Sequence, residues 1–101
     1  MLIVAGEIIT TSEDGRSRFL AAVAPVVTQT LGEAGCQTYA FSPDPTDPCL
    51  IRLYELWDDE ASLAAHLGSP HVAEWRAVQA SLPIVSRSIN KYTISDVNPL
   101  G

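Results

Sequence analysis

The stretch "LYELWDDEASLAAHLG", residues 53–68, joins a strand to a helix and decides the fold. Its first five residues are apolar or aromatic except for Glu55, and strand alternation places Glu55 on the same face as Leu53 and Trp57. After two aspartates, which can cap a helix, the apolar spacing becomes helical. That helix puts His66 on the stripe that should rest on the sheet. A carboxylate and an imidazole therefore stand in the most apolar part of the chain, where a charge needs a partner.

The sequence on either side supplies the remaining elements. Runs rich in β-branched and aromatic residues predict strands, and apolar residues at three- and four-residue spacing predict helices. Pro25 lies inside the first helix, where it predicts a kink or a break. Ser69 and Pro70 form a typical helix start. The predicted elements are strands at 2–10, 36–41, 50–57 and 85–95, a helix at 16–31, a short helix at 58–68 and a second helical piece at 69–83.

The order of these elements is β-α-β-β-α-β, which predicts an α+β protein with a ferredoxin-like fold and an antiparallel sheet. The chain has 101 residues, which is the size of one domain. We expect that domain to span residues 1–101, with a core at 2–95 and a loose C-terminal tail at 96–101.

Both faces of the predicted sheet are apolar, although the helices can cover only one of them. The first strand offers Leu2, Val4 and Ile8 to one face and Ile3, Ala5 and Ile9 to the other. A contiguous apolar face is unusual on a monomer. We therefore expect a homodimer in which two sheets pack face to face about a two-fold axis, forming an α+β barrel.

Composition excludes several classes of function. The net charge is -6 and the six basic residues are scattered along the sequence, so no basic cluster predicts nucleic-acid binding. No apolar run approaches the roughly 18 residues of a membrane span, and the start "MLIVAGE" does not resemble a signal peptide. We expect a cytoplasmic protein. The two cysteines belong to no Cys/His cluster, so no metal site is predicted.

Several motifs resemble the antibiotic biosynthesis monooxygenase family of dimeric α+β barrel proteins. They are "EAGCQTYAF", the loop "DPTDPC", and the run "LYELWDDEASLAAHLGSPH" with its Glu-x-Trp and His-x4-His spacing. The resemblance covers about residues 2–94. It implies a small oxygenase that converts a quinol or a polyketide-type phenol to a quinone with dioxygen, without metal, flavin or other cofactor. A second implied class is a small-molecule-binding or regulatory barrel without chemistry.

The same family includes haem-degrading oxygenases, and this branch can be compared residue by residue. It has an Asn on the first strand, a Trp on the helix after the third strand and a haem-ligating His ten residues later. Glu7, His66 and Arg76 stand at those positions here. The sequence lacks all three residues of that branch, although His66 or His71 could still ligate iron.

For the oxygenase, the resemblance and the strand pattern together indicate His66 as a base that Glu55 orients. The alternative is a structural bond between Glu55 and His66 that fastens the helix to the strand. His71, at a helix start where a charged imidazolium is disfavoured, is a second candidate base. The expected substrate-binding residues are Tyr39, Phe41, Trp57, His71 and Trp75, which would contact a small aromatic substrate.

Overall fold

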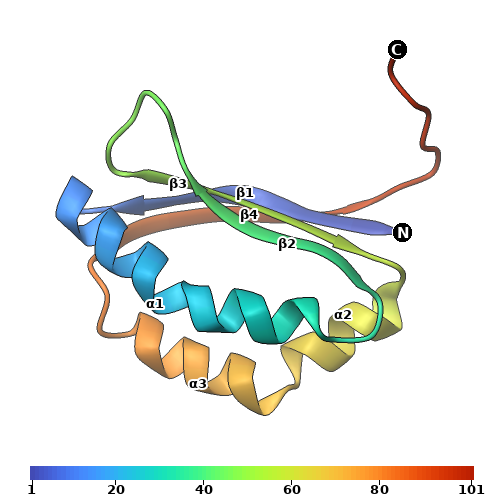
Figure 1. Ribbon diagram of the computed structural model, residues 1–101, viewed down its shortest axis with the longest axis horizontal. Helices are drawn as coiled ribbons and strands as arrows, with labels where there is room; N and C mark the ends of the chain where they lie inside the picture. The colour runs from blue at the N-terminus through green and yellow to red at the C-terminus, as the bar shows by residue number, and fades with distance from the viewer.

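The computed structural model describes residues 1–101 and has one four-stranded sheet with helices on one side (Figure 1). All neighbouring strands are antiparallel, in the order β2-β3-β1-β4. This confirms the ferredoxin-like α+β fold, with the second helical segment divided in two. The elements are β1 (Leu2–Thr10), α1 (Glu13–Leu31), β2 (Cys36–Pro43), β3 (Leu50–Trp57), α2 (Glu60–Leu67), α3 (Pro70–Gln79) and β4 (Ile84–Thr93).

The inner face of the sheet carries the hydrophobic core. The register places Leu2 opposite Trp57 and Ile8 opposite Ile51, and all four side chains are buried under the helices. Phe19 from α1 joins the same cluster. Val4 and Glu55 form another opposed pair on this face, so the carboxyl of Glu55 points into the space between the sheet and the helices.

Helix α1 begins at Glu13, where the side chain of Ser12 accepts a hydrogen bond of 3.0 Å from the Gly15 amide. The helix continues through Pro25 without interruption, so the predicted break does not occur. Pro25 and Ala21, the residue whose carbonyl loses its helical partner, both lie on the exposed side. Water can therefore bind the freed carbonyl, which reduces the cost of the proline.

The loop between β2 and β3 is fastened by hydrogen bonds rather than by apolar contacts. The Asp44 carboxylate accepts hydrogen bonds from the backbone amides of Thr46 and Asp47 at 3.0 and 2.9 Å. The guanidinium of Arg52 donates to the same carboxylate at 2.9 Å. Arg16 reaches from α1 to the backbone carbonyl of Asp47 at 2.7 Å. This loop is therefore a structured feature.

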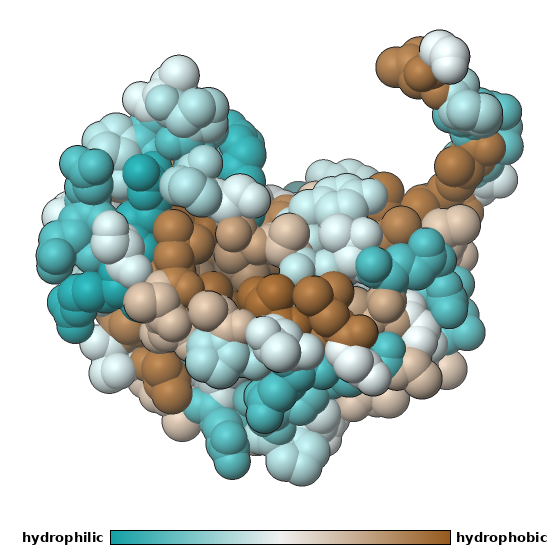
Figure 2. Space-filling view, in the orientation of Figure 1, coloured by the Kyte–Doolittle hydropathy of each residue, from teal (hydrophilic) through white to brown (hydrophobic).

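The outer face of the sheet has no cover within the chain. Tyr54 and Tyr92 are among its exposed side chains, and Glu7 pairs with Arg52 at 3.0 Å. The β2–β3 loop and the C-terminal tail both rise on this side (Figure 1), and the surface between them is hollowed (Figure 2). The length and hydropathy that a membrane-spanning helix requires are not combined in α1, α2 or α3.

Candidate active site

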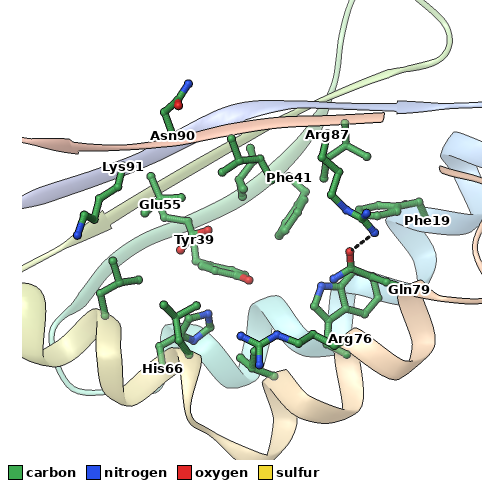
Figure 3. A pocket seen from close by; sticks show the side chains of 18 of the residues that line it. Phe19, Tyr39, Phe41, Glu55, His66, Arg76, Gln79, Arg87, Asn90 and Lys91 are labelled. Carbon is green, nitrogen blue, oxygen red and sulfur yellow. Dashed lines mark hydrogen bonds between the residues drawn. The ribbon is translucent and has the colours of Figure 1, made fainter. Parts of the chain in front are cut away.

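A cavity of about 750 Å³ lies between the inner face of the sheet and helices α2 and α3 (Figure 3). Its volume is in the range of pockets that take small organic ligands. Most of its lining is hydrophobic, and the aromatic part consists of Phe19, Tyr39, Phe41 and Trp75. Phe19 and Trp75 meet edge to face with ring centroids 5.3 Å apart. The interior therefore suits a flat, apolar ring system.

The register of β2 and β3 places two of these aromatic residues and the carboxyl group of Glu55 side by side at the cavity. Tyr39 of β2 lies opposite Glu55 of β3, and Phe41 lies opposite Leu53. All four residues line the cavity. Burial raises the pKa of Tyr39, and the negative charge of Glu55 raises it further. The Tyr39 hydroxyl is therefore a protonated group at neutral pH.

Glu55 does not pair with His66, contrary to the sequence-based expectation. Its Oε1 accepts a hydrogen bond of 2.9 Å from the indole Nε1 of Trp57, which lies two residues further on the same strand face. Burial raises the pKa of the Glu55 carboxyl to about 7, against the opposing effect of the Trp57 hydrogen bond. Glu55 is therefore poised to gain or lose a proton near neutral pH.

Glu33 takes the place expected for Glu55. It lies in the turn after α1, and its Oε2 is 2.9 Å from Nδ1 of His66. An ionised carboxylate can only accept a hydrogen bond, so Nδ1 of His66 carries the proton in this pair. The turn depends on Gly35, which has φ of +81°, and a Cβ there would collide with the side chain of Ser62.

His66 is held in a buried position beside the cavity. Its ring centroid lies 4.8 Å from that of Trp57 and 5.4 Å from that of Tyr39. This burial lowers the pKa of His66, although Glu33 acts in the opposite direction. The neutral ring with Nδ1 protonated has an unprotonated Nε2, for which the chain provides no hydrogen-bond partner. Because His66 lines the cavity, Nε2 is the atom available to a ligand.

The other expected site residues divide between the cavity and its supporting structure. Tyr39, Phe41 and Trp75 line the cavity, whereas Trp57 and His71 do not. Trp57 is fully buried and supports Glu55. Nε2 of His71 lies 2.7 Å from Oε1 of Glu33, so His71 shares the carboxylate that contacts His66.

Glu33, His66 and His71 are also the residues that could hold a metal ion. Their ligand atoms lie within 4.8 Å of one another. Two imidazoles and one carboxylate form a donor set that suits zinc or ferrous iron. Nδ1 of His66 is hydrogen-bonded to Glu33, and Nε2 of His71 lies against its other oxygen, so a metal would have to enter between the carboxylate and both rings.

Sequence reasoning did not identify Glu33, because a polar residue between two glycines is typical of any turn that ends a helix.

The basic residues were also interpreted as scattered along the sequence. The structure brings Arg76 of α3 and Arg87 and Lys91 of β4 to the lining of this one cavity. The three residues lie on consecutive elements, and the turn between α3 and β4 folds them onto the same cavity.

The sequence pattern of the antibiotic biosynthesis monooxygenase family matches residues 1–78. The match includes β1 to β3, α2 and most of α3, which carry Glu33, Glu55, His66 and the aromatic lining. The chain belongs to this family.

Proteins from several organisms are similar to the chain. An uncharacterised protein of Synechocystis sp. is 26% identical over 99 residues, covering 98% of this chain and 67% of its own length. A candidate antibiotic biosynthesis monooxygenase of Deinococcus radiodurans has a TM-score of 0.88 at 22% identity, with all of both chains covered. A conserved protein of Methanosarcina mazei has a TM-score of 0.81 at 24% identity, covering 90% of this chain and 89% of that one. At such identities these two structures show the fold alone.

Proposed function

We propose that the protein is a cofactor-independent monooxygenase that oxidises an electron-rich phenol, quinol or polyketide-type aromatic to a quinone with dioxygen. The observation that carries this proposal is the state of His66 at the cavity. Glu33 contacts its Nδ1 at 2.9 Å, and its Nε2 has no partner in the chain. A buried, neutral imidazole with one nitrogen oriented and the other free is the form required of a general base.

The reaction requires a base, a proton donor and an apolar space for the ring, and the cavity has a candidate for each. His66 removes a proton from the substrate through Nε2, and the resulting anion transfers one electron to dioxygen. The two radicals combine to form a carbon–oxygen bond and a peroxide. Loss of water from the peroxide then leaves a carbonyl. Overall, the substrate and one dioxygen give a quinone and one water, so no external reductant is consumed.

Glu55 is the proposed donor in the last step. The departing oxygen needs a proton to leave as water, and the pKa of Glu55 near 7 keeps a protonated fraction available at neutral pH. Trp57 holds one oxygen of this carboxyl in place at 2.9 Å. The aromatic lining around both groups excludes water, which protects radical intermediates from side reactions.

We also propose that the chain pairs through the outer face of the sheet. This face exposes Tyr54 and Tyr92 and contains a hollow of about 500 Å³. Val97 in the adjoining tail is exposed as well. A second copy packed sheet to sheet would cover these apolar groups. Analytical ultracentrifugation should give a dimer at micromolar concentration, and a monomer across that range would contradict the pairing.

Anthrone and isotopically labelled dioxygen provide the sharpest test of the reaction. The methylene carbon of anthrone becomes a carbonyl at the expense of one dioxygen, with release of one water. In ¹⁸O₂ we expect accelerated oxygen uptake and one labelled oxygen in the anthraquinone formed. His66→Ala should lower kcat by about 100- to 10,000-fold, the usual contribution of a general base.

Arg18→Gln is the matched control, because Arg18 is exposed and does not line the cavity. It should retain the wild-type rate. Rates equal to buffer for anthrone and for several naphthols would contradict the monooxygenase and favour a binding module with the same cavity.

A further inference from the structure

Three of the six basic residues of this acidic chain line the cavity of the proposed active site. Arg76 comes from α3, and Arg87 and Lys91 come from β4. All three are exposed residues, so they border the part of the cavity that solvent reaches. Figure 3 shows them around the rim of the apolar space that Tyr39 and Phe41 line. A ligand entering the cavity therefore passes positive charge in a protein whose net charge is -6.

The partners of these residues decide how much of that charge is free. Lys91 donates to the Glu60 carboxylate at 2.9 and 3.1 Å, so its charge is largely compensated. Arg87 donates to the neutral side-chain oxygen of Gln79 at 2.9 Å, which leaves its charge uncompensated. Arg76 has no hydrogen-bond or ion-pair partner in the chain. Two guanidinium groups with uncompensated charge therefore border the cavity.

The position of Arg76 connects this charge with the proposed base. Arg76 follows Trp75, whose ring lines the interior. The positive charge of Arg76 also contributes to lowering the pKa of His66, so the two side chains are close enough to interact. A ligand group bound at Arg76 would thus lie near His66, with its ring system directed among the aromatic side chains.

We propose that the cavity takes an aromatic acid, whose ring enters the apolar interior and whose carboxylate is bound by Arg76 with Arg87 beside it. The planar guanidinium of arginine matches a carboxylate through two parallel hydrogen bonds. The carboxylate would fix the orientation of the ring relative to His66. This inference names the substrate class of the proposed monooxygenase and rests on that function for its catalytic meaning.

Binding of two unreactive ligands tests the inference separately from turnover. Naphthalene-2-carboxylate and naphthalene-2-carboxamide have nearly the same shape and differ in charge. Isothermal titration calorimetry on the protein as purified should give the carboxylate at least tenfold higher affinity. Salt should weaken binding of the carboxylate but not of the amide, because exposed charges are screened.

Arg76→Gln should lower the affinity for the carboxylate about tenfold and leave that for the amide unchanged. The control Arg18→Gln removes the same charge away from the cavity and should change neither. An unchanged melting temperature for Arg76→Gln would show that the fold is intact. Equal affinities of the wild-type protein for the two ligands would overturn the inference, as would an Arg76→Gln variant that keeps the preference.

The two proposals fail in distinguishable ways. Preference for the carboxylate, with no oxygen uptake on anthrone or on a hydroxynaphthoate that carries both a phenol and an acid, would contradict the monooxygenase and support the anion site. Efficient oxidation of anthrone, combined with equal binding of the naphthoate and its amide, would support the monooxygenase and overturn the anion site.

Discussion

Two carboxyl groups, one in the loop before β3 and one near the end of β3, have pKa values shifted in opposite directions. Asp44, in the β2–β3 loop, accepts hydrogen bonds from two backbone amides, and these are the main reason why its pKa is lowered to about 2. Glu55, at the cavity, has only the Trp57 indole as donor, and burial raises its pKa to about 7. Donors stabilise the charged form and burial disfavours it. The loop carboxylate is therefore ionised at neutral pH and structural, whereas the cavity carboxyl can exchange a proton near neutral pH.

Among the carboxyl groups near the cavity, Glu33, which contacts both histidines, should affect the rate most. In Glu33→Gln the new amide can donate to Nδ1 of His66, which would favour the tautomer with the proton on Nε2. The nitrogen facing the cavity would then have no lone pair to accept a proton. We expect kcat for anthrone oxidation to fall by about 100-fold or more, since a wrong tautomer is severe in other histidine-based sites.

The double variant Glu33→Gln/His66→Ala tests whether Glu33 acts through the imidazole. If Glu33 acts through His66, the double variant should be no slower than His66→Ala alone. Multiplicative losses, measured by steady-state oxygen uptake, would contradict a role of Glu33 that depends on the imidazole.

The second effect concerns stability and Glu55. The pKa of Glu55 rises from 4.5 to about 7 on folding, so between these values the folded state binds more protons than the unfolded state. The free energy of unfolding should therefore fall as pH rises through this window, by roughly 3 kcal/mol in total for this group. Glu55→Gln should lack this contribution while still accepting the Trp57 hydrogen bond.

Urea denaturation between pH 4 and 8 measures this difference. The stability of Glu55→Gln minus that of the wild type should increase with pH and level off above about 7. A difference independent of pH would mean that Glu55 has an ordinary pKa.

The smallest effect on the free energy of unfolding is expected at Asp44. Its dependence on pH is opposite to that of Glu55, because the Asp44 contribution is lost in acid. Its folded pKa of about 2 lies below the reference value of 3.8, so its contribution to stability is present above pH 3.8 and lost as pH falls through about 2. Asp44→Asn should be less stable than the wild type at neutral pH, and the difference should shrink in acid. Thermal denaturation followed by circular dichroism measures this, with the exposed Glu74→Gln as control.

The sequence predicted the fold and the contents of the inner sheet face because both depend on local periodicity. Strand alternation correctly placed Glu55 with Leu53 and Trp57, and helical spacing correctly placed His66 against the sheet. Periodicity does not identify hydrogen-bond partners. The indole of Trp57 reaches Glu55 along its own strand, and the turn at Gly35 brings Glu33 to His66 from 33 residues away.

The grouping of Arg76, Arg87 and Lys91 at the cavity could not be predicted from the sequence for a related reason. Arg76 and Arg87 are separated by the end of α3, a turn and the start of β4. Only the packing of α3 beneath the sheet places both at one cavity (Figure 3). Charged residues that folding brings together do not form a basic run in the sequence, so local composition does not reveal them.

The proposed chemistry depends on the protonation state of His66, which nitrogen NMR of ¹⁵N-histidine-labelled protein measures. At pH 7 we expect a neutral His66 ring with the proton on Nδ1 and an unprotonated Nε2, and a pKa below the ordinary value of histidine. Assignment by comparison with His71→Gln leaves one ring to observe. An imidazolium at pH 7, or a neutral ring protonated on Nε2, would rule out His66 as the base.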